Sequence, residues 1–185
     1  PVFRAWKIPV LGDIPVIGPM LFNQNLFVYA ALVMVAVATY YLFHTRHGLR
    51  ARAVGEHPRA ADTLGIDVYR TRYMHVTLGG MVAGFAGAWF TLGSVGRFDE
   101  GMTGGRGYIG LAAMIFGRWH PVGALAAALV FGFADSLQQK LALLGTPIPS
   151  EFLAMSPYIA TVIVVAGLVG RARPPAADGK PYVKE

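Results

Sequence analysis

The sequence predicts an all-α fold, a polytopic transmembrane helix bundle of about four full spans and one short or re-entrant helix. The first observation is composition, because 55% of the 185 residues are hydrophobic and only 14% are charged. A soluble domain carries roughly 25% charged residues, so this chain has too little polar sequence to coat a globule. The second is a set of long apolar runs without charge, and the third is the placement of basic residues between them. With no Cys present, disulfides and thiolate metal sites are excluded.

The apolar runs set the expected spans. A bilayer core needs about 20 apolar helical residues, and residues 25–43 supply them without one charge and with aromatic residues at both ends. Residues 73–93 form a second span, interrupted only by His75, and residues 151–170 contain another. These three stretches predict full transmembrane helices.

A glycine-rich stretch and two apolar runs lie between residues 101 and 141. The run over residues 108–117 is too short to cross the bilayer and predicts the half-membrane or re-entrant helix. The run over residues 121–137 is long enough to span, and Pro121 suits the first turn of a helix. We therefore expect a short helix, a break at residues 118–120, and a span.

Basic residues predict the orientation. With the loop at residues 44–72 and the tail at residues 171–185 both cytoplasmic, Arg118 is also inside, so that eleven Lys and Arg lie inside and five outside. The same assignment accounts for the net charge of +6, which in a hydrophilic protein would suggest nucleic acid. We expect no nucleic-acid partner. We also expect one membrane-spanning domain over residues 1–185, the C-terminal part of a longer protein, since its first twenty residues read as a Pro-rich loop.

Small residues repeat on two of the expected spans. Gly80, Gly84 and Gly87 share nearly one face, and Ala124, Ala128 and Gly132 recur every fourth residue on the later span. Close backbone approach drives helix association in lipid, so both ridges predict tight packing.

The cytoplasmic loop contains a second short helix signal. Pro58 stands where a helix can begin and Gly65 where it can end, with Ala60, Ala61 and Leu64 expected on one side. A helix of two turns is marginal in water, so it needs a surface to hold it, either its own bundle or another protein. The alternative is an ordinary solvated loop.

Two separated motifs resemble a known family. Residues 48–61 (GLRARAVGEHPRAA) and 64–70 (LGIDVYR) resemble the cytoplasmic coupling loop of ABC importer permeases for branched-chain amino acids, simple sugars and nucleosides. Residues 104–117 (GGRGYIGLAAMIFG) with 121–124 (PVGA) resemble that group's second signature. Residues 8–18 and 131–138 are most similar to its nucleoside (guanosine and purine nucleoside) branch. One departure is Arg118-Trp119, where sugar-type members usually place small glycines.

The resemblance implies a type II ABC importer permease in the plasma (inner) membrane of a prokaryote. Such a permease is not an enzyme and has no cofactor or metal; a separate ATPase subunit hydrolyses ATP. It pairs with a second permease subunit as a homo- or heterodimer, lies in membrane lipid, and receives solute from an extracytoplasmic binding lipoprotein. The loop residues implied to dock on the ATPase are Glu56, Pro58, Arg59, Ala60, Ala61, Leu64 and Gly65.

Polar residues at membrane depth are candidates for the solute pathway. We single out Tyr108, Asp135 and Gln138, since a carboxylate and an amide can bind hydroxyls or ring nitrogens of a polar solute. For Asp135 the alternative is a helix cap or a hydrogen bond between helices. His75, near the inner end of its span, favours an interfacial role over a proton relay.

Three other functions remain as alternatives. A sugar or branched-chain amino acid permease has the same architecture and differs only in pocket residues. A purely structural membrane subunit is a second possibility. An intramembrane enzyme is disfavoured, because His44, His47 and His57 lack the H-E-x-x-H spacing and no G-x-S-x-G is present.

Overall fold

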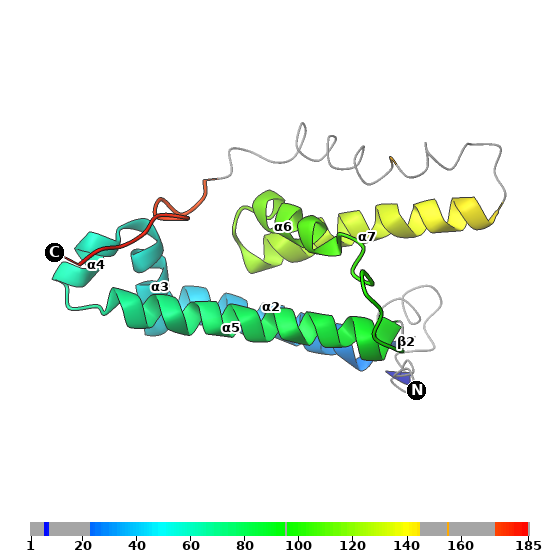
Figure 1. Cartoon of the computed structure of the whole chain (residues 1–185), viewed down its shortest axis with the longest axis horizontal. Helices are drawn as coiled ribbons and strands as arrows, with labels where there is room; N and C mark the ends of the chain where they lie inside the picture. The colour runs from blue at the N-terminus through cyan, green and yellow to red at the C-terminus, as the bar shows by residue number, and fades with distance from the viewer. Residues whose placement is uncertain (1–5, 8–22, 95, 145–154, 156–172, 185) are drawn as a thin grey trace. The chain divides into compact units, whose positions relative to one another are not determined.

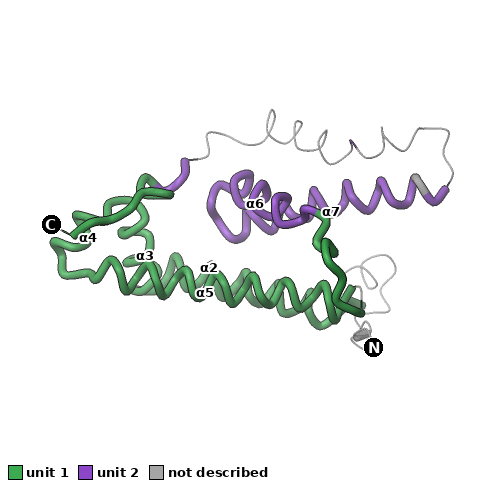
Figure 2. The backbone as a smooth tube through the Cα atoms, viewed as in Figure 1, with its two compact units in different colours: residues 1–104, 176–185 green, residues 105–175 purple. Residues whose placement is uncertain are grey.

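The computed structural model describes residues 6–7, 23–94, 96–144, 155 and 173–184. These residues are mostly helical, as Figure 1 shows. The chain divides into two units, residues 1–104 with 176–185 and residues 105–175, which are coloured separately in Figure 2.

Two antiparallel helices form the body of the first unit. A two-residue strand, β1 (Trp6–Lys7), pairs antiparallel with β2 (Asn23–Gln24), and α2 (Leu26–His44) follows at once. The chain then forms α3 (Arg46–Glu56), α4 (Pro58–Thr63), α5 (Val68–Ala88) and the π-helical turn η2 (Trp89–Ser94). Two ring contacts fix the antiparallel register of α2 and α5: Phe27 lies 5.2 Å from Phe85, and Tyr41 lies 5.9 Å from His75 between ring centroids.

Side-chain caps begin three of these helices. Asn25, Thr45 and Asp67 each accept a hydrogen bond from a backbone N–H in the first turn of α2, α3 and α5 respectively. Each cap satisfies one of the donors that a helix start leaves without a partner, a contribution of roughly 1 kcal/mol. These polar side chains therefore determine where the three helices begin.

The turn from α2 to α3 depends on Gly48. This residue is buried, and a Cβ placed on it would collide with the backbone of Tyr41 and Leu42. Moving backbone atoms aside costs free energy in both helices. The last turn of α2 and the first turn of α3 can therefore approach this closely only because residue 48 is glycine.

A helical hairpin forms the second unit. The short helix α6 (Arg106–Phe116) turns through residues 117–120 into α7 (Pro121–Leu143). Its core contains Ala113, Ala127 and Phe131, with Phe116 packed against Phe131 at 5.7 Å between ring centroids. At the base of the hairpin, Gly117 lies against the backbone of Gly123 and Ala124, where a Cβ would not fit.

The hairpin turn holds two residues in a left-handed conformation. Arg118 has φ 57° and Trp119 has φ 58°, a region that costs a non-glycine residue roughly 1–2 kcal/mol. The amide of Arg118 donates to the Ile115 carbonyl at 3.0 Å and that of Trp119 to the Met114 carbonyl at 3.1 Å, which closes α6 with a Schellman motif. Glycines would suit these positions better, and the sequence places none there.

Among the described residues, three helices are long and apolar enough to cross a membrane: Leu26–His44, Val68–Ser94 and Pro121–Leu141. They correspond to three of the expected spans, and α6 has the expected short length. The remaining expected span, over residues 151–170, lies outside the described residues. In the first two, the apolar windows are 0% buried within the chain, so their faces are open to lipid or to other protein.

Among the described residues, the glycines of the two small-residue ridges make no close contacts: a Cβ on Gly80, Gly84, Gly87 or Gly132 would meet nothing within 4 Å. Ala124 of the second ridge does make one, because its backbone lies against Gly117. The close approaches instead lie at Gly48, Gly117 and Gly123, all next to turns, where the connecting loop itself holds two backbones together.

Candidate functional site

The charged loop between the two long helices of the first unit folds around a small core of its own. Val54 of α3, Ala61 of α4 and Val68 of α5 are 3%, 3% and 1% exposed, and Ile66 and Tyr182 pack against them. The loop is therefore an ordered element rather than a solvated connector. The sequence required a surface to hold the short helix, either in its own bundle or on another protein. This core is such a surface within the chain itself.

The short helix begins and ends where its sequence predicts. Pro58 is its first residue, and Gly65 follows its last turn with φ 78°. The amide of Gly65 donates to the Asp62 carbonyl at 2.8 Å, and that of Ile66 donates to the Ala61 carbonyl at 3.1 Å. This pair of bonds is a Schellman motif, and its left-handed position favours glycine.

The two predicted docking alanines differ in exposure. Ala61 is buried in the loop core, whereas Arg59, Ala60 and Leu64 are exposed, Leu64 by 81%. The expectation that Ala60, Ala61 and Leu64 share one side is thus wrong. At about 100° per residue, Ala61 and Leu64 would lie on nearly the same side of a continuous helix. Leu64, however, is the C-cap that follows the last helical residue, so it does not share the buried side of α4 with Ala61. The surface open to a partner contains Arg59, Ala60 and Leu64.

Glu56 and the C-terminal segment make a contact that the sequence did not reveal. Glu56 ends α3, and its Oε2 accepts a hydrogen bond from the Ala176 amide at 2.7 Å. The next amide, of Ala177, donates to the Gly55 carbonyl at 2.9 Å. Contacts between residues more than a hundred positions apart leave no local pattern in the sequence. The sequence indicated only that the loop and the C-terminal tail lie on the same side of the membrane.

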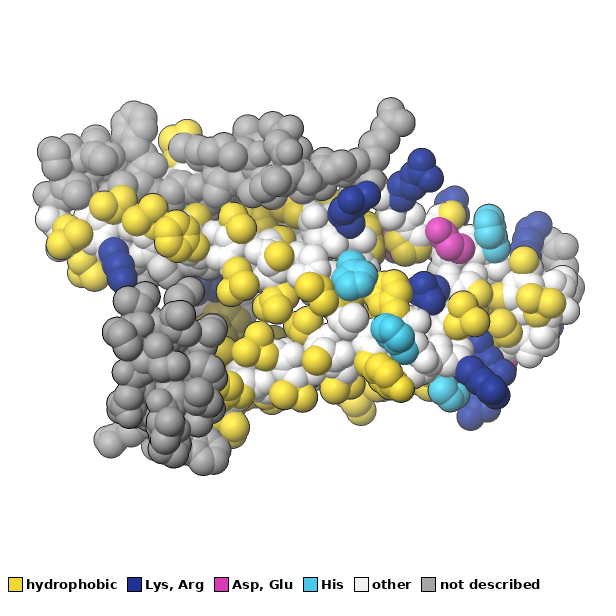
Figure 3. Space-filling view, turned by 180° about the vertical axis from the view of Figure 1, so that it is seen from behind, with side chains coloured by type: hydrophobic (Ala, Val, Ile, Leu, Met, Phe, Trp, Pro, Cys, Tyr) yellow, Lys and Arg dark blue, Asp and Glu magenta, His cyan; other side chains and the backbone are white. Residues whose placement is uncertain are grey.

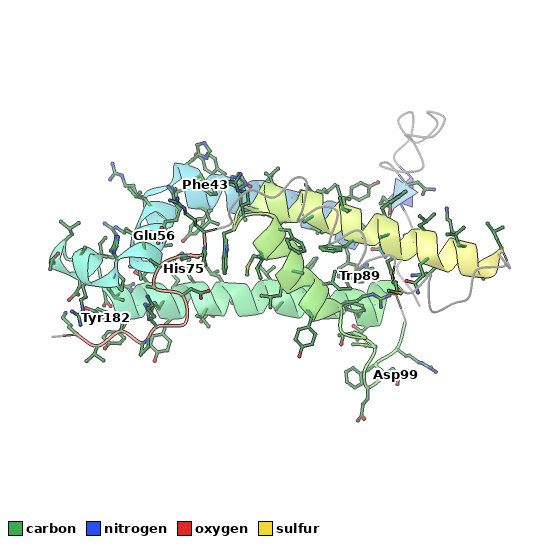
Figure 4. All side chains as sticks on the ribbon, turned by 90° about the horizontal axis from the view of Figure 1, so that it is seen from above. Phe43, Glu56, His75, Trp89, Asp99 and Tyr182 are labelled. Atoms are coloured by element: carbon green, nitrogen blue, oxygen red, sulfur yellow. The ribbon has the colours of Figure 1, made fainter. Side chains whose placement is uncertain are left out.

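Farther along the segment, Tyr182 lies over α4 and α5. Its ring lies 5.4 Å from that of Tyr69 between centroids, and its carbonyl accepts the Tyr69 hydroxyl at 3.1 Å. Loss of solvent around the phenol raises the pKa of Tyr182, and a hydrogen bond to the Asp62 carboxylate raises it further. A protonated phenol can donate to Asp62, so both effects favour the neutral side chain. Figure 4 labels Glu56 and Tyr182 on this part of the chain.

Basic side chains gather around this loop. Figure 3 shows Lys and Arg side chains near the end of the first unit that carries α3 and α4, while apolar side chains cover its long helices. The Arg52 guanidinium lies 4.8 Å from the centroid of the Phe43 ring, a cation–π contact at the end of α2. A charged, folded loop at the end of two apolar helices is the arrangement expected where spans leave a membrane.

Of the predicted solute-path residues, Asp135 has defined partners in the second unit. Its Oδ2 lies 3.7 Å from Nη2 of Arg106 at the start of α6 and accepts from Nε2 of Gln139 at 3.0 Å. Gln138, three residues beyond Asp135 on α7, is half-buried, and Tyr108 on α6 is 81% exposed. The carboxylate thus joins the two helices of the hairpin, which is one of the two roles weighed for it.

His75 links α5 to α2. Its Nδ1 lies 2.8 Å from the Thr71 carbonyl oxygen and its Nε2 lies 3.3 Å from the Tyr41 hydroxyl. Because a carbonyl only accepts, Nδ1 carries a proton, and in neutral imidazole Nε2 then accepts from Tyr41. A histidine held by two such bonds between spans fits a structural role.

Within the parts of the chain that the structure describes, no three His, Asp or Glu side chains come close enough to hold a metal ion. With its spans and its folded loop, the chain is a multi-pass membrane protein of the transport-permease class, located in the plasma (inner) membrane.

Comparison with known proteins defines the family. Residues 11–169 match the family described as branched-chain amino acid transport system / permease component, and the chain belongs to it. It is 44% identical over 185 residues to the guanosine ABC transporter permease protein NupQ of Bacillus subtilis, covering 98% of this chain. It is 46% identical over 186 residues to the nucleoside ABC transporter permease protein NupC of Lactococcus lactis, covering 97% of this chain.

A more distant relative carries a different solute name. The putative glucose ABC transporter permease protein of Haloferax volcanii is 33% identical over 191 residues, which cover 91% of this chain. The chain spans 58%, 57% and 58% of the length of these three relatives. No solved structure matches the chain.

Proposed function

We propose that this chain is part of the permease subunit of an ATP-driven ABC importer and helps to form the pathway for nucleosides or a similar small polar solute. Support comes from the family and from two nucleoside-permease relatives that cover nearly the whole chain. In this proposal the fold is of the type II importer class, with about four full spans and the short α6 in a single domain over residues 1–185.

The observation that carries the proposal is α4. It is a six-residue helix that is folded onto its own loop core and still presents Arg59, Ala60 and Leu64 outward. Ala60 lets a partner approach closely, while Arg59 and Leu64 offer charge and apolar surface beside it. We propose that residues 44–72 form the cytoplasmic coupling loop, that residues 171–185 form a cytoplasmic tail, and that α4 enters a groove of the ATPase subunit.

Each predicted docking residue has a distinct part in this proposal. Arg59, Ala60 and Leu64 touch the ATPase. Pro58 and Gly65 define the ends of α4, and Ala61 anchors it in the loop core. Glu56 acts through the C-terminal segment that it binds.

The remaining partners follow from the same proposal. The subunit pairs with a second permease subunit, as a homo- or heterodimer, and receives its solute from an extracytoplasmic solute-binding lipoprotein. It is not an enzyme and needs no cofactor, because the ATPase subunit hydrolyses ATP.

For the solute pathway we propose Tyr108, Asp135 and Gln138. Asp135 and Gln138 lie three residues apart on α7 and so share a face of that helix. The ion pair with Arg106 holds the carboxylate at a fixed place rather than preventing it from accepting a further hydrogen bond, since its side chain remains 42% exposed.

A sugar pathway is the second candidate, supported by the similarity to the putative glucose permease. Arg118 and Trp119 weigh against it, since the sugar-type members that the sequence resembles place small glycines there. Branched-chain amino acids are a further alternative within the same family.

Uptake of labelled guanosine, adenosine, glucose and leucine tests the function in cells that carry the full-length permease with its ATPase subunit. We expect guanosine and adenosine to accumulate, and Ala60→Trp to abolish both uptake and co-purification of the ATPase subunit. The bulky ring blocks approach to the exposed face of α4 without touching the spans. Leu49→Trp, at a position on α3 that is 60% exposed, is the matched control and should retain both.

Several results would count against this proposal. Glucose or leucine uptake in place of nucleoside uptake would support the second candidates. If uptake and co-purification both survive Ala60→Trp, α4 is not the docking element. A chain that supports no uptake and binds no ATPase is a structural membrane subunit.

A further inference from the structure

Residues 176–184 lie across the coupling loop and contact all three of its helices. The amides of Ala176 and Ala177 bind the end of α3, at Oε2 of Glu56 and at the Gly55 carbonyl, with distances of 2.7 and 2.9 Å. Near the other end, Nζ of Lys184 lies 3.6 Å from Oδ1 of Asp62 in α4. We refer to residues 176–184 as the strap.

Between these anchors the strap is tied to α5. Nη1 of Arg72 donates to the Lys180 carbonyl at 3.0 Å, and the Tyr69 hydroxyl donates to the Tyr182 carbonyl at 3.1 Å. Most of these bonds use backbone groups of the strap, so they depend on its path rather than on its side-chain identities. Two side chains of the strap also take part: Lys184 lies near Asp62, and the Tyr182 ring packs against the core of Val54, Ala61 and Val68.

We infer that the strap is a positioning element of the coupling loop: it holds α4 at a fixed orientation, and docking on the ATPase subunit requires it. This inference rests on the proposed function of α4. The strap lies outside the loop in sequence, and nothing in the sequence of the loop indicates that this segment orients α4.

The size of α4 is the physical reason. A six-residue helix has too few internal hydrogen bonds to be stable alone. Within the described chain it is held by one buried side chain, Ala61, whose methyl group provides little apolar surface. The Tyr182 ring and the Asp62 contacts add the surface and the polar bonds that this small core lacks.

Geometry makes the strap and the docking face compatible. Tyr182 packs on the side of the loop that contains Ala61 and lies near the Arg59 charge, whereas Ala60 and Leu64 are exposed. A partner can therefore bind the exposed face while the strap remains in place. A docking helix transmits force only when its orientation is fixed, because small displacements of a supporting shell weaken the contacts that it positions.

Three variants of the full-length permease test the inference. Tyr182→Ala removes the ring, Tyr182→Phe keeps the ring and removes only its hydroxyl, and Val183→Ala alters a neighbour that is 70% exposed. Each is combined with Ala61→Cys, in a permease from which any cysteine outside these 185 residues has been removed, so that a membrane-permeant thiol reagent reports exposure of the loop core. ATPase co-purification and labelled guanosine uptake are measured in the same cells.

We expect Tyr182→Ala to raise labelling at position 61 and to lower both co-purification and uptake by about tenfold, which corresponds to about 1.4 kcal/mol. Membrane insertion should persist, since the spans are unchanged. Tyr182→Phe should lose no more than about twofold, because the ring packing remains and a partly exposed hydrogen bond contributes little. Val183→Ala should match the parent.

The outcomes separate this inference from the function on which it rests. If labelling rises in Tyr182→Ala but co-purification and uptake stay at the parent level, the strap does not position α4 for docking. If labelling does not rise, the strap does not hold the loop core, and the inference is equally overturned. If Ala60→Trp has no effect on coupling, the proposed function of α4 fails whatever Tyr182→Ala does.

Discussion

Asp135 shows how one residue can be both a helix contact and a pathway candidate. It lies fourteen residues beyond Pro121, about 21 Å along α7, beside Arg106 and Gln139. In water, an ion pair between half-exposed side chains contributes about 0–1 kcal/mol to the free energy of folding. Stabilisation by the pair is therefore a weak explanation for two charges at this position. A carboxylate that also accepts a solute hydroxyl gives a stronger one.

Exchange of the two charges separates these roles. We expect Arg106→Asp and Asp135→Arg each to lower guanosine uptake by about tenfold and to reduce thermal stability in detergent. The double variant should recover stability, because opposite charges again face each other, but not uptake, because the solute meets an arginine in place of a carboxylate. Recovery of both would show that Asp135 serves only to join α6 and α7.

Single residues near helix ends could be predicted from the sequence. Pro58 and Gly65 begin and end α4 because each has a backbone restriction that acts locally. The side that Ala61 faces could not be predicted in this way. A six-residue helix has no repeating pattern to establish which side is buried, and its burial is decided by Val54, Val68 and a tyrosine more than a hundred residues away.

At the scale of elements, turns rather than spans carry the close backbone contacts. Gly117 meets the backbone of Gly123 and Ala124 across the α6–α7 turn, while Gly84 on α5 has open space around it. A small-xxx-small pattern predicts that a face can be approached closely. It does not identify what approaches, and in this chain the described residues supply no partner for it.

The pair Gly117→Ala and Gly84→Ala tests this contrast. We expect Gly117→Ala to destabilise the hairpin by about 1–3 kcal/mol, since backbone atoms must shift to admit a methyl group. Gly84→Ala should be neutral or should stabilise α5 by up to about 1 kcal/mol through helix propensity. Thermal unfolding in detergent measures both, with a shift of about 2–4 °C per kcal/mol.

Equal destabilisation by Gly84→Ala in the assembled transporter would contradict the open-space account. It would place the glycine face of α5 against another subunit or against further helices of the permease.

At the scale of the whole molecule, the contacts of the strap and the distribution of charge both place the loop and the C-terminal segment on the same side of the membrane. The strap hydrogen-bonds to α3 and α5, so the charged loop and the C-terminal segment lie on one side of the membrane. The distribution of Lys and Arg assigns both to the cytoplasm for an independent reason. The long spans, the short α6 and the existence of a loop helix could be predicted because each depends on local composition; the strap could not, because its bonds are long-range.

Single cysteines test the orientation in intact cells. Ala60→Cys and Ala176→Cys should resist an impermeant thiol reagent, and Ser94→Cys, at the end of η2, should react. Ala60 and Ser94 are exposed, so in cells that lack the ATPase subunit, which would otherwise cover Ala60, a lack of labelling at position 60 reports its side of the membrane. Ala61 is too buried to label from either side. Reaction at position 60 in intact cells, with none at 94, would reverse the orientation.

The shortness of α6 has a consequence for how water enters the protein. Eleven residues rise about 16 Å, roughly half of the 30 Å hydrocarbon layer. In the proposed topology the α6–α7 turn lies at one surface, which would place the opposite end of α6 and the Arg106–Asp135 pair well inside that layer. Backbone and charges at such depth require a hydrated recess or covering protein. Such a recess shortens the low-dielectric distance that a polar solute must cross, so that part of the work of dehydrating it is avoided before any helix moves.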